Sequence, residues 1–350
     1  TLARLIATFE AGQDVSFLGF HAENPTGYGR VLYDDSGATL AIREEKELEP
    51  ADREIDLVNG GLYLVEEGLL REFIGGVQKS EHQGEYLLTD VVEYAIRLGR
   101  TADVVVVKDP EELQGVNTRV HLATVTKRLR RVRNEALMLG GVSIQNPDTV
   151  DVDYTVEVGP DTLLEQGVSL RGSTSLEGQT VVARGSVIID STVGPRCHIK
   201  PYCMLESSVI HEGCTVGPFA HTRPGTVLET GAKLGNFVET KKTRVGPGSK
   251  VSHLTYLGDC EVGTQVNVGA GTITCNYDGI NKHKTVLGDH VFVGSDVQFV
   301  APVTVGEGAV IAAGATITRD VPPGALAISR TDQVDVEGYT ERKRREREGD

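Results

Sequence analysis

Residues 287–317 read LGDHVFVGSDVQFVAPVTVGEGAVIAAGATI. A large apolar residue returns at every sixth position: Leu287, Val293, Phe299, Val305, Ile311 and Ile317. A helix repeats every 3.6 residues and a strand every 2, so neither explains a period of six. Six is the period of a parallel β-helix, in which short strands joined by tight turns stack into coils and bury a continuous column. The stretch therefore predicts a solenoid, with function on its surface.

The same period extends over most of the C-terminal half. Upstream, apolar residues again stand six apart: Val158, Leu164, Leu170, Leu176, Val182 and Ile188. Further hexads follow with slips of phase, from about residue 142 to residue 328. The pattern breaks at residues 275–284, CNYDGINKHK. Because a solenoid accommodates insertions only as external loops, and such loops tend to line a binding face, we expect a functional loop here.

Length and composition limit the classes of protein that fit. The 350 residues suffice for about two domains, and a formal net charge of −15 argues against nucleic acid and anionic membranes as partners. No apolar run reaches the roughly 18 residues of a membrane span, and no secretory signal opens the chain. The five cysteines are odd in number and form no C-x-x-C pair, so they support neither a disulfide framework nor a zinc knuckle. We expect a protein of the reducing cytoplasm, with no nucleic acid or membrane partner.

The N-terminal region, residues 1–120, has α/β character. Residues 29–33, 62–65 and 104–107 suit strands, and Thr89 with Asp90 can cap a helix that runs to Gly99. The order of elements is that of an incomplete layered domain with a small core. The chain has no initiating Met and opens inside a helix-like stretch, residues 1–9, so we expect a fragment whose beginning is missing.

Residues 121–141 are predicted to form a helix that connects this region to the solenoid, residues 142–330. Its apolar residues alternate steps of three and four, which places them on one face: Leu122, Val125, Leu129, Val132, Ala136 and Leu139. Basic residues occupy the other faces and Gly140-Gly141 ends the helix. A run of charge is usually a solvated face, so we interpret the helix as a connector rather than a nucleic-acid reader. Residues 331–350 form a polar C-terminal tail, of which we expect residues 341–350 to be frayed.

Positive charge gathers in one part of the solenoid. Between His221 and His253 there are six Lys or Arg residues against two Glu, a local net charge of +4 in an acidic chain. Such a cluster suggests a small anionic ligand, although an exposed charged face is the plain alternative. His253 lies off the apolar column, and with Lys241 and Tyr256 nearby it is a candidate general base.

Two other patterns are weaker. The sequence Gly269-Ala270-Gly271-Thr272 imitates a phosphate-binding loop, but it lies inside the hexads with no helix after it. The nine histidines include no pair at metal-binding spacing, so we expect no metal on the solenoid.

Three long strings carry a resemblance to a known family. They are residues 235–242, GNFVETKK, residues 253–259, HLTYLGD, and residues 267–279, NVGAGTITCNYDG. With Val293-Gly294-Ser295 and residues 325–330, ALAISR, they closely resemble the bifunctional bacterial enzyme glucosamine-1-phosphate N-acetyltransferase and N-acetylglucosamine-1-phosphate uridyltransferase, the GlmU family. The resemblance covers the chain from about residue 24.

The resemblance implies a left-handed parallel β-helix, a homotrimer, and acetyl-transfer sites between subunits. It implies that His253 is the base that takes a proton from the amine of glucosamine-1-phosphate as the amine attacks acetyl-CoA. The sugar phosphate would be held by Arg223, Lys241, Tyr256 and Asn267. The residues implied for acetyl-CoA are Ala270, Asn276, Tyr277, Ser295, Ala313 and Arg330, with backbone N–H groups near Ala270 facing the developing oxyanion.

For the N-terminal region, the resemblance implies a nucleotidyltransferase-like, incomplete Rossmann-like domain. Gly29, Glu44 and Asn59 would contact UDP-N-acetylglucosamine, and Asn117 would bind both it and Mg²⁺. The family's G-x-G-T-R-M phosphate loop, its Lys and its metal-binding Asp are not found in these 350 residues, so we expect no transfer of UMP from UTP by this chain alone.

Three functions are compatible with these features. The first is the acetyltransferase, which supplies the precursor of UDP-N-acetylglucosamine for cell-wall synthesis. The second is a sugar-nucleotide pyrophosphorylase whose β-helix only oligomerises, and the third is a scaffold without catalysis. Neither alternative needs His253, Lys241 or the Asn276-Tyr277 loop, so loss of acetyl-CoA thioester in the presence of glucosamine-1-phosphate distinguishes them.

Overall fold

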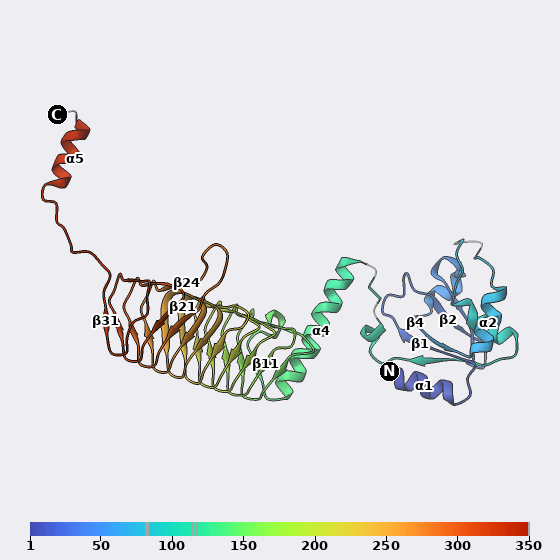
Figure 1. Cartoon of the computed structure of the whole chain (residues 1–350). Coiled ribbons are helices and arrows are strands. Elements are labelled where there is room, and N and C mark those ends of the chain that lie inside the picture. Colours follow the sequence, from blue (N-terminus) through green and yellow to red (C-terminus); the bar gives the residue numbers. More distant parts are fainter. Residues whose placement is uncertain (81–83, 114, 117, 349–350) are drawn as a thin grey trace. The chain divides into compact units, whose positions relative to one another are not determined.

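A computed structural model describes residues 1–80, 84–113, 115–116 and 118–348 of the chain (Figure 1). It divides into two compact units, Thr1–Val125 and Thr126–Asp350, and the boundary falls inside one helix, α4 (Arg119–Leu139). Across the part of the chain that is described, no helix has both the length and the apolar character needed to cross a bilayer.

Unit 1 is built on a five-stranded mixed sheet of order β3-β2-β4-β1-β5, in which β1 runs antiparallel to β4 and parallel to β5. Its helices and strands are α1 (Leu2–Glu10), β1 (Val15–His21), β2 (Arg30–Tyr33), β3 (Thr39–Arg43), β4 (Leu57–Val65), α2 (Glu67–Gly76), α3 (Asp90–Arg97) and β5 (Ala102–Val106). Phe17 and Leu18 in the middle of β1 are fully buried. The sequence predicted β2, the end of β4, α3 and β5, but missed β1, β3 and α2.

One detail of α3 differs from the prediction. The helix begins at Asp90, but the Thr89 side chain makes no capping hydrogen bond. The Thr89 hydroxyl instead lies 3.2 Å from Glu44 Oε1, to which it donates. Its backbone is helical rather than extended, with φ −55° and ψ −29°, so the hydroxyl does not face the first turn.

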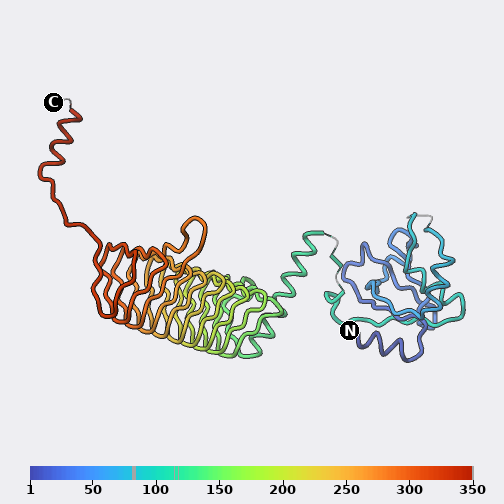
Figure 2. Tube along the Cα trace, in the orientation of Figure 1, coloured from blue at the N-terminus to red at the C-terminus, as the bar shows by residue number. Residues whose placement is uncertain are grey.

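Unit 2 is a parallel β-helix, as the hexads predicted. Fifteen short strands, β6 to β20, lie between Ser143 and Leu228, and the long strands β21 (Lys233–Val245) and β22 (Lys250–Val262) follow. Nine more, β23 to β31, lie between Asn267 and Ala327. In most coils each strand pairs in parallel with the strand three elements later, so three strands make one coil. The stacked coils are clear in the Cα trace (Figure 2).

The six-residue positions form the core of this unit. All six apolar residues between Leu287 and Ile317 are buried, and so are five of the six upstream, Val158 being partly buried. Each fully buried side chain of this size contributes about 1.5–3 kcal/mol by leaving water. Coils approach too closely for a side chain at Gly294, where a Cβ would lie 2.5 Å from the backbone nitrogen of Ala313. The six-residue period in the sequence therefore identifies the buried core positions of the β-helix.

The break at residues 275–284 is an external loop, as predicted. It leaves the coil after β24 (Ile273–Cys275) and returns at β25 (Thr285–Leu287). Residues 276–284 project from the stack of coils (Figures 1 and 2).

Helix α4 is present but docks by a different side from its regular apolar face. Leu129, Val132 and Leu139 of that face are exposed, whereas Asn134 and Leu137 are buried. The Asn134 amide donates to the carbonyl oxygens of Pro147 at 2.8 Å and Val150 at 2.9 Å. These two bonds favour this orientation, because they give partners to two carbonyl oxygens beneath the helix.

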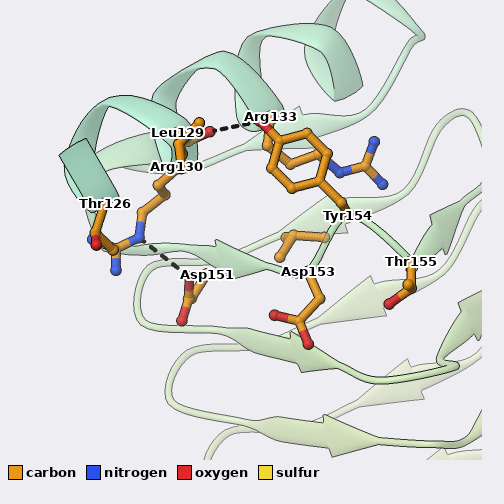
Figure 3. A pocket seen from close by; sticks show the side chains of 9 residues that line it. Thr126, Leu129, Arg130, Arg133, Asp151, Asp153, Tyr154 and Thr155 are labelled. Carbon is orange, nitrogen blue, oxygen red and sulfur yellow. Dashed lines mark hydrogen bonds and ion pairs between the residues drawn. The ribbon is translucent and has the colours of Figure 1, made fainter. Parts of the chain in front are cut away.

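A shallow cavity of about 380 Å³ lies between α4 and the first coils (Figure 3). Arg130 Nε reaches Asp151 Oδ1 at 3.4 Å, and the Tyr154 hydroxyl donates to the Leu129 carbonyl at 3.4 Å. The lining includes none of the site residues predicted from the sequence. We therefore assign the cavity to helix docking.

The C-terminal tail differs from the prediction. Residues expected to be frayed form a helix, α5 (Tyr339–Glu348). The stretch is rich in Glu, Lys and Arg, which favour helix, and Lys343 pairs with Glu346 at 2.6 Å. It buries no side chain, so local propensity rather than packing accounts for it.

Candidate active site

Five site residues predicted from the sequence lie on one edge of the β-helix, which we call the histidine edge. Asn236 pairs with His253 on the next coil, and Gly271 N donates to Leu254 O at 3.0 Å, which places Ala270 beside His253. The series continues through Ser295 and Ala313, because Asp296 N donates to Ala270 O and Gly314 N to Ser295 O. Arg330 Nη1 donates to Ala313 O at 2.8 Å. The edge therefore carries the candidate base and four candidate acetyl-CoA residues, from Ala270 to Arg330.

His253 is exposed on this edge, and its ring is held by Asn236. Nδ1 of His253 lies 2.7 Å from Oδ1 of Asn236. Because an amide oxygen only accepts, this contact places the proton on Nδ1 and leaves the lone pair on Nε2. A neutral imidazole in this tautomer can take a proton from a substrate amine. Sequence reasoning missed the role of Asn236, although its separation of 17 residues from His253 equals one coil.

A second edge of the β-helix carries positive charge. We call Arg223, Lys241 and Lys282 the cation cluster. Thr222 pairs with Thr240 on the next coil, which sets Arg223 beside Lys241. Repulsion from Lys282 first, and then from Arg223, lowers the pKa of the Lys241 ammonium below its usual range. Arg223 is partly neutralised by Glu239, at 2.9 Å. Unbalanced like charges of this kind favour an anionic ligand.

Tyr256 and Asn276 converge between the two edges. A Cβ at Gly258 would lie 2.5 Å from the Tyr256 hydroxyl and 2.6 Å from Asn276 Nδ2, so both polar ends occupy the space above that glycine. Gly258 is paired with Lys241 on the previous coil. The phenol and the amide therefore lie beside the cation cluster, where the phenol can hydrogen-bond a bound sugar.

Two further predicted residues are more separate. Asn267 is exposed in β23 (Asn267–Val268), beside Lys250. It therefore lies on the opposite side of the histidine edge from Tyr256. Tyr277 is 59% exposed on the loop, and its hydroxyl donates to Gly279 O at 2.6 Å. In one chain, the Tyr277 hydroxyl is therefore engaged within its own loop.

Three residues predicted for the sugar nucleotide meet in unit 1. Asn59 N donates to Gly29 O at 2.8 Å, and Glu44 Oε1 lies 3.4 Å from the position that a Gly29 Cβ would take. Burial raises the pKa of the nearby Tyr63 phenol well above its ordinary value. Asn117, predicted as the Mg²⁺ ligand, lies outside the described residues. Among residues that are described, no three His, Cys, Asp or Glu side chains gather as a metal site would require.

Comparison with known proteins identifies the family of the chain. Residues 284–319 match the model of the bacterial transferase hexapeptide family (six repeats). The bifunctional protein GlmU of Pelobacter propionicus is 48% identical over 340 residues, which are 97% of this chain and 74% of that protein. The chain belongs to the GlmU family. GlmU of Trichlorobacter lovleyi is also 48% identical, over 98% of this chain and 75% of its own length.

Membership of the GlmU family makes the chain an enzyme with transferase activity. Solved structures are more distant. The UDP-N-acetylglucosamine acyltransferase of Francisella novicida is 15% identical over 52% of this chain and 65% of that chain, with a TM-score of 0.34. The Arabidopsis UDP-N-acetylglucosamine acyltransferase is 14% identical over 53% of this chain and 69% of that chain, with a TM-score of 0.29.

Proposed function

We propose that this GlmU-family chain transfers the acetyl group of acetyl-CoA to the amine of glucosamine-1-phosphate, which gives N-acetylglucosamine-1-phosphate. The observation that carries the proposal is the His253 imidazole, oriented by Asn236, on the same strand as Gly258, which pairs with Lys241 of the cation cluster. A base alone would fit many reactions, and cations alone would fit any anion. Together they fit a nucleophile carried by a phosphorylated substrate, and in the GlmU family we propose that this nucleophile is the amine.

The chemistry follows from the positions of these groups. Nε2 of His253 accepts a proton from the substrate amine while the nitrogen attacks the thioester carbonyl carbon. The backbone N–H of Ala270 stabilises the oxyanion, since the N–H groups of Gly269 and Gly271 donate to Val293 and Leu254. Collapse of the oxyanion then breaks the carbon–sulfur bond. The imidazolium then returns its proton to the departing CoA thiolate. Asn236 holds the ring through Nδ1 during both proton transfers.

Substrate binding is assigned to the two edges. Arg223 and Lys241 bind the phosphate, joined by Lys282, and Tyr256 and Asn267 bind the sugar. Acetyl-CoA lies along the histidine edge and the loop. The residues proposed to hold it are Ala270, Asn276, Tyr277, Ser295, Ala313 and Arg330.

We propose that the enzyme is a homotrimer with its sites between copies, in the reducing cytoplasm. Three exposed aromatic rings, Tyr202, Phe219 and Phe237, stack along the histidine edge with centroids 5.4 Å and 5.3 Å apart. An exposed apolar ridge of this length favours coverage by another protein surface. A neighbouring copy seated there would lie directly against His253.

For the family's second reaction, we propose that Gly29, Glu44, Asn59 and Asn117 belong to a site for UDP-N-acetylglucosamine and Mg²⁺. These 350 residues assayed alone are expected to make no UDP-N-acetylglucosamine from UTP and N-acetylglucosamine-1-phosphate. Formation of that product would contradict this expectation. Product formation without acetyl transfer would favour the pyrophosphorylase alternative.

The deciding experiment measures loss of the acetyl-CoA thioester. Release of free CoA should require glucosamine-1-phosphate and be much slower with glucosamine, which lacks the anion for the cation cluster. His253→Ala should lower kcat by about 10²–10⁴-fold, the usual contribution of a general base. Full activity in His253→Ala would remove the imidazole from the mechanism, and equal rates with both sugars would remove the cation cluster.

A further inference from the structure

The loop at residues 276–284 is organised around one carboxylate, that of Asp278. Its Oδ1 accepts hydrogen bonds from Ile280 N at 2.7 Å and Asn281 N at 2.6 Å, and its Oδ2 lies 2.7 Å from His283 Nε2. Together these contacts hold the pKa of Asp278 at about 2. The carboxylate therefore stays charged at neutral pH and ties the tip of the loop to its returning arm.

Both ends of the loop are also fixed. Asn276 Nδ2 donates to Asp259 Oδ2 at 2.6 Å on the previous coil, and Lys284 Nζ lies 2.6 Å from Glu261 Oε1. Within the loop, Tyr277 and Lys282 form an antiparallel bridge. The backbone from Asn276 to Lys284 is therefore a short hairpin with anchors at its base, and the Asp278 carboxylate braces its tip.

This hairpin brings the positive charge of Lys282 to a part of the surface that already carries Arg223 and Lys241. Asn276 lies over Gly258, which pairs with Lys241, so the loop starts beside the cation cluster. Lys282, on the returning arm, is the main source of the repulsion felt by Lys241. An unbraced loop would relax by moving Lys282 away, because exposed like charges gain by separating. The contacts of Asp278, together with the Tyr277–Lys282 bridge, oppose that movement.

We propose that Asp278 is a positioning residue that holds Lys282 beside Lys241, so that the phosphate-binding cations are preassembled before substrate arrives. The inference rests on the proposed function and adds to it the origin of the site's affinity. Asp278 is not among the residues proposed to bind substrate, and its carboxylate is engaged within the loop. Its effect should therefore appear in binding of the sugar phosphate and not in the chemical step.

A double-mutant cycle tests this directly. Asp278→Ala should raise the KM for glucosamine-1-phosphate by about tenfold, the factor expected from losing one charge-assisted anchor, with kcat within about threefold. Lys282→Ala should raise KM by a similar factor. The KM of Asp278→Ala/Lys282→Ala should then equal that of Lys282→Ala, because Asp278 no longer has a lysine to position. Asp278→Asn keeps the oxygen that accepts from Ile280 and Asn281 and should recover most of the affinity.

The matched control is Asp289→Ala. Asp289 Oδ1 also accepts a backbone hydrogen bond, from Thr264 N at 2.6 Å, but on a turn away from the loop. We expect its KM to be unchanged. KM effects of Asp278→Ala and Lys282→Ala that simply multiply would overturn the inference, as would an unchanged KM in Asp278→Ala.

Hydrogen exchange separates this inference from the proposed function. The amides of Ile280 and Asn281 should exchange about tenfold or more faster in Asp278→Ala than in the parent or in Asp289→Ala. If the parent enzyme shows no acetyl transfer, the proposed function fails. The role of Asp278 is then tested by amide exchange and by comparing the affinities of the parent and Asp278→Ala for inorganic phosphate. Unchanged exchange in Asp278→Ala shows that the carboxylate does not order the loop.

Discussion

Replacing Asn236 by Ala should slow acetyl transfer without removing the base. In the parent, the Asn236 oxygen accepts the Nδ1 proton of His253 at 2.7 Å, and it does so more strongly when the ring becomes imidazolium. A hydrogen bond to a charged partner contributes about 1.5–3 kcal/mol, and about 1.4 kcal/mol corresponds to tenfold in rate. We therefore expect kcat to fall by about 10–100-fold, with little change in the KM for glucosamine-1-phosphate.

The assay is the release of free CoA at saturating acetyl-CoA. Gln265→Ala is the matched control, since Gln265 is an exposed amide side chain on a turn that carries no candidate site residue. The variant Asn236→Ala/His253→Ala should be no slower than His253→Ala, because Asn236 acts only through the ring. Full kcat in Asn236→Ala, or a double variant slower by the product of both factors, would refute this reasoning.

Gly258→Ala should raise the KM for glucosamine-1-phosphate severalfold, because the new methyl group displaces the Tyr256 hydroxyl and the Asn276 amide, which is held on Asp259; an unchanged KM would contradict this. The lowered pKa of Lys241 means that its ammonium deprotonates at lower pH than a free lysine, so affinity for the sugar phosphate should weaken with rising pH earlier than in Lys282→Ala. Identical KM–pH profiles would argue against repulsion within the cation cluster. Of the five thiols, Cys275 alone is exposed and should react quickly with a thiol reagent, the other four only on unfolding. More than one fast thiol per native chain would contradict the buried positions of the others.

The β-helix was predictable because its rule is local. Each buried position from Leu287 to Ile317 is fixed by its own hexad, and coils pair only with neighbouring coils. The sheet of unit 1 follows no such rule. Strand β1 lies between β4 and β5, which come some 40 and 85 residues later, so its partners cannot be inferred from local sequence. The run Val15-Ser16-Phe17-Leu18 did offer a signal of a buried strand.

Helix α4 shows how a regular pattern can mislead. Alternating steps of three and four identified the helix correctly, but not the side that docks. Leu139 is 91% exposed, whereas Asn134 is fully buried. Hydropathy alone ranks these two residues in the opposite order. The carbonyls of Pro147 and Val150 need a donor, and a sequence pattern does not record which backbone groups lack partners.

The histidine edge was only partly predictable, because its spacing depends on coil length. Asn236, His253 and Ala270 stand 17 residues apart, the length of one coil, and the loop lengthens the next step, from Ala270 to Ser295, to 25. Arg330 again follows Ala313 by 17 residues. A sequence pattern that follows only the six-residue period cannot connect Ala270 to Ser295, because the loop lengthens that coil. The buried apolar positions of the coil are unchanged. The extra residues of that coil include Asn276, Tyr277, Asp278 and Lys282. The interruption that obscures the edge in the sequence is thus the same segment that brings a cation to the candidate phosphate site.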